Sequence, residues 1–314
     1  NLRTTIWNSA MTTRNANQKK FKDLKKYAKN KEINISSPVN SYLFKNKFLH
    51  KNSIVIPISK GIINNTYLIS SGNNKYIVKL ERKEKIGQTI SLKKQTDLII
   101  YLSNHEITPK LISFNEELSI LMLEYKENFF RKPKLEMSKV KNIEKVIHIL
   151  KKLHKLEFNL PELKLTKVAK NYIKNIGGID KLDQEKKQWS EYMFSLADIF
   201  DKKFEPNSLC HNDLIPENII YNRSIWLVDF EFSVISDPVL DLAGLAAMNN
   251  YNTKQIEFLL GSYYGRKIPY PIKLFKDLIL LLKLITYFWG LSYSVNIKSI
   301  IQPSFASHMK KMIK

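Results

Sequence analysis

Apolar residues in the first part of the chain alternate with polar ones or occur in short runs, which is the pattern of β-strands. The predicted strands cover residues 53–59, 66–70, 75–80, 110–114 and 118–125. Helical spacing predicts one helix at 89–104, and the polar stretch 31–52 is expected to be a loop. The first 125 residues therefore predict a small sheet with one crossing helix.

After residue 125 the helical pattern dominates. One apolar stripe at helical spacing consists of Val140, Ile143, Val146, Ile147, Leu150, Leu153 and His154. Further helices are predicted at 166–176, 181–203, 238–250, 253–265 and 271–295. Between them, residues 207–235 form a β-rich insert, with apolar runs at 218–221 and 224–228 separated by the turn Asn222-Arg223.

Membrane insertion and secretion are not expected. The longest apolar run, residues 278–291, is interrupted by Lys283 and is shorter than the roughly 20 residues that a membrane span needs. The first twenty residues lack the apolar core of a signal peptide. Because Cys210 is the single cysteine, no internal disulfide framework or cysteine-based zinc site is expected, and a reducing, cytoplasmic location is predicted.

Residues 1–30 form a polar N-terminal extension, in which Phe21, Leu24 and Tyr27 predict a short basic helix at 16–30. The chain starts at Asn1 and Met11 is an alternative start. Residues 1–10 are therefore left out of the functional argument, and whether they are native stays open.

The net charge of +22 raises the question of nucleic-acid binding. Only six of the 51 basic residues are arginines, and arginine is favoured where phosphates or bases are held by two hydrogen bonds. The lysines are scattered along the chain. A solvated lysine surface is the simpler interpretation, and no nucleic-acid partner is expected.

The segment His211–Asn218 is short, polar and bounded by apolar runs, which is typical of a functional loop on a rigid scaffold. A hairpin made by the runs at 218–221 and 224–228 would bring Asn218 beside Asp229. An amide oxygen and a carboxylate are suitable ligands for Mg²⁺. Asp213 stands apart and can accept a proton from an incoming hydroxyl, so the set matches the division of roles in phosphotransfer. Any one of these residues alone would equally be a turn or cap residue.

The pattern His211-Asn212-Asp213-Leu214-x-Pro216-x-Asn218 resembles the phosphotransfer loop of the choline kinase and aminoglycoside phosphotransferase superfamily. The continuation from Asp229 through Glu231 to Asp241-Leu242-Ala243 is more similar to the bacterial choline kinase branch, as are Leu153-His154 and the segment Phe288–Leu291. The resemblance covers roughly residues 53–300. It implies an α+β, bilobal, protein-kinase-like fold, with a small antiparallel-sheet N-lobe at 31–125 and a larger, mainly helical C-lobe at 126–314.

The resemblance also implies ATP and Mg²⁺, with Asp213, Asn218 and Asp229 as catalytic residues and Asn218, Asp229 and Glu231 on the metal. The implied nucleotide residues are Gly61, Asn64, Lys79, Gln95, Glu124 and Tyr125. Taken alone, Gly61 would be a plain hairpin turn and Lys79 an edge-strand lysine. Gln95 stands where the family has a carboxylate, so that a Lys79–Gln95 hydrogen bond would replace an ion pair, and Lys60 and Ile63 also depart from the family's turn.

For the acceptor, the resemblance implies a quaternary ammonium such as choline, bound by aromatic faces and carboxylates. The implied substrate residues are Asp213, Glu231, Asp241, Tyr251, Trp289 and Tyr293, with Tyr287 as a further wall. Met248 and Ser292 replace a carboxylate and a tryptophan of the family. Asp241 is equally interpretable as a helix cap or as a structural partner of the catalytic loop, and Trp289 as a core aromatic.

The sequence thus predicts a kinase that phosphorylates choline or a related amino alcohol and gives phosphocholine. Ethanolamine, thiamine, a sugar or an aminoglycoside remain alternative acceptors, although the basic charge disfavours a polycation. A pseudokinase-like nucleotide-binding protein is the alternative from another class. Oligomeric state is not predicted.

Overall fold

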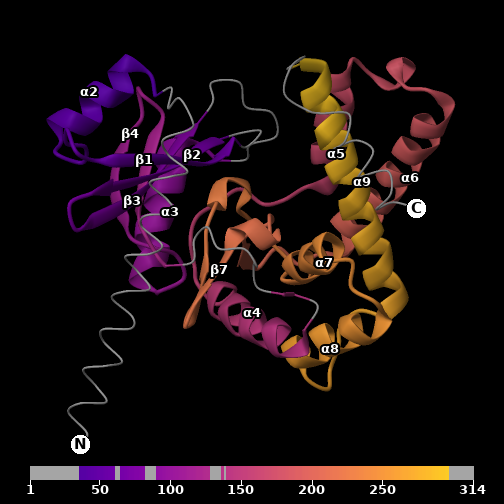
Figure 1. Ribbon diagram of the computed structural model, residues 1–314. Helices are drawn as coiled ribbons and strands as arrows, with labels where there is room; N and C mark the ends of the chain where they lie inside the picture. Colours follow the sequence, from indigo (N-terminus) through magenta and orange to yellow (C-terminus); the bar gives the residue numbers. More distant parts are fainter. Residues whose placement is uncertain (1–34, 61–63, 82–89, 128–135, 138, 297–314) are drawn as a thin grey trace, which may run out of the picture. The chain divides into compact units, whose positions relative to one another are not determined.

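A computed structural model describes residues 35–60, 64–81, 90–127, 136–137 and 139–296. The chain divides into two compact units, Asn1–Lys83 with Ile112–Tyr125 and Glu84–Leu111 with Lys126–Lys314. Each unit is described by itself below (Figure 1). The predicted extension at 1–30, with its helix at 16–30, lies outside the described residues.

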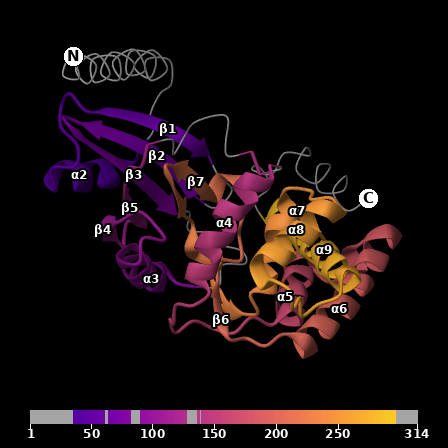
Figure 2. The ribbon, with the colours of Figure 1, turned by 90° about the horizontal axis from the view of Figure 1, so that it is seen from below.

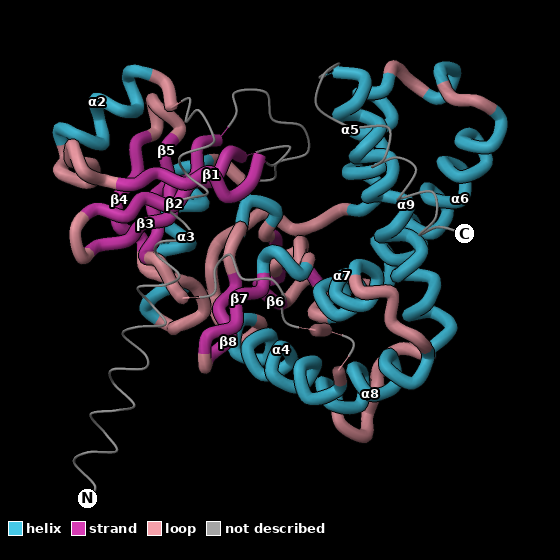
Figure 3. The backbone as a smooth tube through the Cα atoms, viewed as in Figure 1, coloured by secondary structure: helices cyan, strands magenta, loops and turns pink. Residues whose placement is uncertain are grey.

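The first unit contains a five-stranded sheet with the strand order β1-β2-β3-β5-β4 (Figure 3). Its strands are β1 (Ile54–Lys60), β2 (Asn64–Ser71), β3 (Asn74–Glu81), β4 (Leu111–Asn115) and β5 (Ile120–Glu124). Neighbours β1 and β2, β2 and β3, and β3 and β5 run antiparallel. The predicted antiparallel sheet is confirmed, with strand ends that differ from the prediction by one or two residues.

Helix α2 (Ser37–Lys45) occupies part of the stretch that was predicted to be a loop, so the loop prediction for 31–52 was wrong there. Pro38 lies in the first turn, where its fixed φ favours a helix start. Val39 and Leu43, four residues apart, are buried in the core of the first unit with Ile69 and Val78. The apolar stripe has only these two buried residues in a helix of nine, which is too short to stand out in the sequence.

The second unit is mainly helical. Its helices are α3 (Leu92–Asn104), α4 (Val140–Leu153), α5 (Leu165–Ile176), α6 (Gln184–Lys203), α7 (Val239–Met248), α8 (Thr253–Tyr264) and α9 (Ile272–Asn296). Helices α5, α6 and α9 pack together, and α4 packs against α8 (Figures 1 and 2). Gly177 ends α5 in the left-handed conformation, and Asn252 begins α8 with a capping box. All the helices predicted after residue 125 are confirmed within about three residues of their predicted ends.

Helix α3 belongs with the second unit. Its Leu98 and Leu102, with the following Ile107, are fully buried in the large hydrophobic core of that unit. The described residues 90–111 group with the helical part rather than with the sheet. The predicted lobe boundary at 125/126 stays a prediction.

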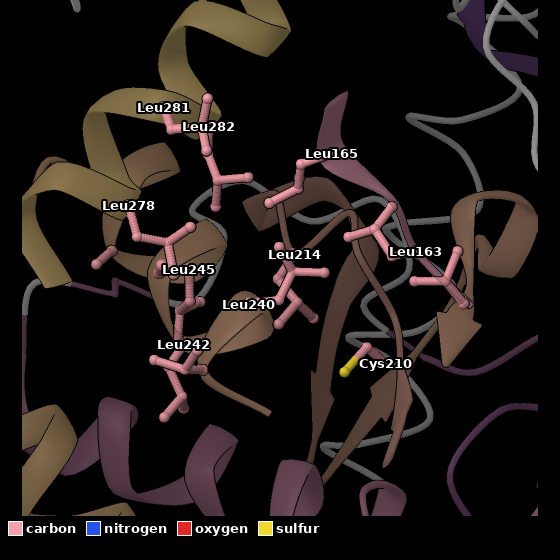
Figure 4. Packing of buried hydrophobic residues seen from close by; sticks show 14 of the residues in the cluster. Leu163, Leu165, Cys210, Leu214, Leu240, Leu242, Leu245, Leu278, Leu281 and Leu282 are labelled. Atoms are coloured by element: carbon pink, nitrogen blue, oxygen red, sulfur yellow. The ribbon is translucent and has the colours of Figure 1, made fainter. Parts of the chain in front are cut away.

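The β-rich insert carries two small sheets. Strand β6 (Ser208–Cys210) pairs with β9 (Val234–Ser236), and β7 (Ile219–Asn222) pairs with β8 (Ser224–Leu227). Arg223 forms the predicted turn between β7 and β8, with φ of 57°. Leu214, which follows β6, lies in the core among leucines of α7 (Figure 4). This apolar contact holds the polar loop around it against the helices.

No helix in the described ranges is long and apolar enough to cross a membrane.

Candidate active site

The β7–β8 hairpin brings the two ends of the predicted motif together. Asn218 immediately precedes β7, and Val228 and Asp229 immediately follow β8. The backbone N–H of Val228 donates to the carbonyl of Asn218 at 3.0 Å. Asn218 therefore lies directly beside the residue that precedes Asp229, as the spacing in the sequence predicts.

Asp213 is held by Asn218. The Asn218 Nδ2 donates to the Asp213 carboxylate Oδ2 at 2.7 Å and to the Asp213 backbone carbonyl at 2.9 Å. Both Asp213 atoms are acceptors, so the amide nitrogen of Asn218 faces them and the amide oxygen points away from Asp213. Asn218 thus orients the carboxylate with one atom and presents a hard oxygen with the other.

His211 is fully buried and joins the loop to the segment that follows β8. Its Nε2 lies 3.0 Å from the carbonyl of Val228, and the backbone N–H of Asp213 donates to its Nδ1 at 3.2 Å. A carbonyl accepts and an N–H donates, so the ring carries its proton on Nε2. The ring also packs against Phe230, with the centroids 4.5 Å apart. His211 therefore has a structural role: its ring connects Val228 to the backbone of Asp213.

Two site residues have left-handed backbones. Asn212 has φ of 62°, and Asp229 has φ of 75° and ψ of 63°. Asn and Asp tolerate this conformation better than other residues with a side chain, yet it still costs free energy. The Asn212 Nδ2 donates to the carbonyl of Phe232 at 3.2 Å, which ties the loop to the turn after Asp229. The surrounding contacts thus hold both segments in a sparsely populated conformation.

Asp241, on the first turn of α7, holds the loop by hydrogen bonds to its backbone. Its Oδ2 accepts from the backbone N–H of His211 at 2.8 Å and lies 3.0 Å from the Nε2 of His154, and its Oδ1 accepts from the backbone N–H of Asn212 at 2.7 Å. Burial raises the pKa of Asp241, but the hydrogen bond from His154 and the electrostatic interactions with His154 and His211 outweigh burial, so the pKa is lowered. Of the roles predicted for Asp241, the structural partner of the loop fits. Both of its oxygens are hydrogen-bonded inside the protein, and its role toward the acceptor stays a prediction.

His154, Cys210 and Asp241 form a buried group of residue types that can bind metals. Burial raises the pKa of the Cys210 thiol well above its usual value, and the charges of Asp241 and Asp237 raise it further. The protonated thiol donates to the carbonyl of Asp237 at 3.5 Å. His154 and Asp241 are hydrogen-bonded to each other and the Cys210 thiol to Asp237, so the group is part of a buried hydrogen-bond network.

The predicted nucleotide residues lie in both units. Lys79 is buried on β3, between Thr66 of β2 and Leu121 of β5, so its interpretation as an edge-strand lysine was wrong. Asn64 starts β2 opposite Glu81. Glu124 ends β5, and the Lys75 ammonium lies 5.5 Å from the ring centroid of Tyr125. Gly61 and Ile63 lie outside the described residues.

Gln95 lies on α3 in the second unit and is 2% exposed. Its Nε2 is buried and has no hydrogen-bond partner among the described residues. The bond between Lys79 and Gln95 stays a prediction, because the two residues belong to different units.

Helices α5 and α9 carry the aromatic residues Tyr172, Trp289 and Tyr293. Trp289 and Tyr293 on α9 have ring centroids 5.0 Å apart; Tyr293 is fully buried, whereas Trp289 is partly exposed. Burial raises the pKa of Tyr172 on α5, and the neighbouring Tyr293 and Asp213 raise it further. Tyr172 is therefore within electrostatic range of both Tyr293 and Asp213.

The other predicted acceptor residues lie elsewhere or are already engaged. The Tyr251 hydroxyl donates to the carbonyl of Met137 at 2.8 Å, and Tyr287 packs edge-on against Trp189 in the core. Ser292 is buried and donates to the carbonyl of Trp289. Glu231 is buried in the turn after Asp229. Roles of Tyr251 and Glu231 toward substrate stay predictions.

The donor set at the hairpin fits a magnesium ion. Asn218 offers an amide oxygen, and Asp229 and Glu231 offer carboxylates within one short turn. Few protein oxygens, completed by phosphates and water, are the usual environment of protein-bound Mg²⁺.

Sequence reasoning missed Tyr172 and Tyr263. Tyr172 sits at a buried helical position and nothing in its neighbourhood distinguishes it from a core aromatic. Tyr263 lies on α8, and its hydroxyl is 2.7 Å from the Nδ1 of His154. The pair Leu153-His154 was the available signal, since a buried histidine at the end of an apolar stripe needs partners.

Comparison with known proteins agrees with the fold. A homologue of the protein LicA from Mycoplasma capricolum is 29% identical over 167 residues, covering 52% of this chain and 64% of that protein. LicA from Haemophilus influenzae is 21% identical over 231 residues, covering 71% of this chain and 66% of that protein. The chain thus matches slightly less than two thirds of the length of these relatives.

Among solved structures, the choline kinase LicA from Streptococcus pneumoniae superimposes with a TM-score of 0.72 at 21% identity, covering 88% of this chain and 98% of that one. A choline/ethanolamine kinase family protein from Mesorhizobium loti gives 0.68 at 16% identity, covering 88% and 95%. These likenesses confirm the predicted kinase-like fold. A family model described as the phosphotransferase enzyme family matches residues 54–265, and the chain therefore belongs to this family.

Proposed function

We propose that this chain is a kinase that transfers the γ-phosphate of ATP to the hydroxyl of choline or a related amino alcohol, giving phosphocholine. The observation that carries the proposal is the arrangement of Asp213, Asn218 and Asp229 on one hairpin and its adjoining loop. The family membership makes phosphotransfer the reaction class. The choice of acceptor rests on the aromatic residues of α5 and α9.

Asp213 acts as the base. Its carboxylate accepts the proton of the acceptor hydroxyl as the hydroxyl oxygen forms a bond to the γ-phosphorus and the bond from that phosphorus to the β-phosphate oxygen breaks. The hydrogen bond from Asn218 holds the carboxylate in one orientation during this transfer. The products are the phosphorylated acceptor and ADP, and the proton passes from Asp213 to solvent.

Asn218, Asp229 and Glu231 would hold Mg²⁺, which would neutralise charge on the transferred phosphate when bound. Lys79 and Asn64 would contact the phosphates, and the backbone near Glu124 and Tyr125 would pair with the adenine. Gly61 and Gln95 complete the proposed nucleotide residues. A LicA structure in complex with AMP, similar to this chain with a TM-score of 0.70, is consistent with such a site.

The binding site for the acceptor substrate would consist of aromatic and acidic residues. Trp289 offers a partly exposed ring, and Tyr293 supports it from the buried side. A trimethylammonium group is attracted to such ring faces. Asp213, whose carboxylate receives the hydroxyl proton, would also offer negative charge to the cation. Among amino alcohols, choline uses the aromatic faces best because its ammonium has no N–H to donate.

The test is a screen of ADP release with choline, ethanolamine, thiamine, several sugars and kanamycin, with phosphorylated products identified by ³¹P NMR. The matched control is Asp213→Ala, which removes the base. We expect choline to give the highest kcat/KM and the control to give background release. Release no higher than the control with every acceptor, despite Mg-ATP binding, would favour a pseudokinase-like protein. A sugar or kanamycin as the best acceptor would refute the amino-alcohol assignment while keeping the kinase.

A further inference from the structure

A buried hydrogen-bond chain runs from helix α8 to the catalytic loop. The Tyr263 hydroxyl on α8 lies 2.7 Å from the Nδ1 of His154 at the end of α4, and the Nε2 of His154 lies 3.0 Å from the Oδ2 of Asp241 on α7. The Asp241 carboxylate then accepts the backbone N–H groups of His211 and Asn212. We propose that His154 and Tyr263 are positioning residues that set the place of Asp213 through Asp241. This rests on the proposed phosphotransfer at Asp213.

The direction of the chain follows from the chemistry of its members. Burial raises the pKa of Tyr263, and neighbouring Cys210 and Asp241 raise it further, so the hydroxyl keeps its proton. Asp241 is an acceptor at neutral pH. The consistent arrangement is that Tyr263 donates to Nδ1 of His154 and Nε2 of His154 donates to Asp241. Tyr263 thereby selects the tautomer that can serve the carboxylate.

The side chains of His154 and Asp241 are 2% and 0% exposed, so water does not replace a lost partner easily. A buried carboxylate stays ionised and in place only while its hydrogen-bond donors are present. If Asp241 turns, the two backbone N–H groups lose a common acceptor. Asn212, whose left-handed backbone costs free energy, then relaxes, and it directly precedes Asp213 in the chain.

The displacement needed to harm the reaction is small. The base must lie within hydrogen-bond distance of the hydroxyl, and a shift of about 1 Å costs about 100-fold in rate. His154 and Tyr263 do not contact the reacting atoms in this arrangement. Their effect should therefore appear in kcat, and the KM for ATP should stay nearly constant.

Three variants and one control test the chain. Tyr263→Phe removes the hydroxyl and keeps the ring that packs against His154. His154→Gln keeps a donor at the distance of Nε2, whereas His154→Leu removes it. The control is Tyr264→Phe on the same helix, because the Tyr264 hydroxyl is buried and has no hydrogen-bond partner among the described residues. All rates are divided by the number of sites that bind Mg-ATP, so that misfolded protein does not count.

We expect kcat to fall about fivefold in Tyr263→Phe and about 50-fold or more in His154→Leu, with His154→Gln recovering a large part of the loss. Tyr264→Phe should keep the wild-type kcat. Hydrogen exchange at the amides of His211 and Asn212 should accelerate in the order of the kcat losses. This second measurement needs no acceptor substrate, so it tests the hydrogen-bond chain even if the proposed kinase function is wrong.

Any of three results would refute the proposed positioning role of His154 and Tyr263. These are equal kcat in Tyr263→Phe and Tyr264→Phe, a wild-type kcat in His154→Leu, or unchanged amide exchange in both His154 variants. If His154→Leu does not fold, Tyr263→Phe and His154→Gln decide. A wild type without kinase activity would instead overturn the proposed function, and the exchange data would still test the hydrogen bonds.

Discussion

Replacing Asp241 with Asn keeps the shape of the side chain and removes its charge. Asp241 is completely buried, and its two oxygens receive hydrogen bonds from His154, His211 and Asn212. An asparagine has one oxygen and one NH₂ group. If that oxygen takes the place of Oδ2 and keeps His154 and His211, the NH₂ group meets the backbone N–H of Asn212, and two donors face each other.

The cost can be worked from these contacts. A hydrogen bond to a charged acceptor contributes about 1.5–3 kcal/mol, and leaving a buried donor without an acceptor costs about 1–3 kcal/mol. We therefore expect Asp241→Asn to lower the free energy of unfolding by about 2–4 kcal/mol. For a unit of this size, that corresponds to a Tm lower by about 5–15 °C. The kcat should fall as well, because Asn212 carries Asp213.

The assay is thermal unfolding at several pH values, with Asp198→Asn as the control. Asp198 is an exposed aspartate paired with Lys202 on α6, so its loss should cost less than about 1 kcal/mol. The pKa of Asp241 is lower in the folded than in the unfolded chain, so its stabilisation is fully present above the unfolded pKa of about 4 and is lost as pH falls through the folded pKa. The difference in Tm between wild type and Asp241→Asn should thus be constant from pH 7 to pH 5. A Tm within 2 °C of wild type, or a difference that shrinks over this range, would refute the reasoning.

Three further predictions concern the base, the acceptor and the core. Asp213→Asn should abolish turnover and leave Mg-ATP affinity nearly unchanged by calorimetry; turnover near wild type would remove Asp213 as the base. Trp289→Ala should raise the KM for choline about 5- to 30-fold, the equivalent of one cation–π contact, with little change in the KM for ATP; an unchanged choline KM would contradict the aromatic assignment. Cys210 is buried and its pKa is raised, so iodoacetamide should label it only after unfolding, and rapid labelling of the native protein would contradict this.

Local patterns in the sequence were sufficient for most elements. The β7–β8 hairpin follows from two short apolar runs around Asn222-Arg223, and its position predicts that Asn218 and Asp229 meet. The helices after residue 125 follow from apolar stripes such as the one on α4. These features depend on neighbours within a few residues, which is the range over which periodicity is informative.

Features that depend on distant contacts were missed or left open between alternatives. Helix α2 is stabilised by packing Val39 and Leu43 against the sheet, and its own pattern is short. The choice among the predicted roles of Asp241 depends on His211 and Asn212, which lie 30 and 29 positions earlier. Tyr172 was missed because Asp213, whose charge helps to raise its pKa, lies on another segment. Lys79 could not be placed on a central strand until the order β2-β3-β5 was known. In each case the residue type was visible in the sequence, and the partner was not.

The proposed catalytic residues all lie in the second unit. Residues 211–218 and 228–232 are tied by the contacts of His211 with Val228, of Val228 with Asn218 and of Asn212 with Phe232. All of these residues, and Asp241 beneath them, belong to one unit, whereas Lys79 and Asn64 belong to the other. Loosening residues 211–213 should therefore lower kcat with little effect on ATP binding, and replacing Lys79 should weaken ATP binding with little effect on kcat. A loop variant that lost both together would mean that nucleotide binding depends on the same hydrogen bonds as the base.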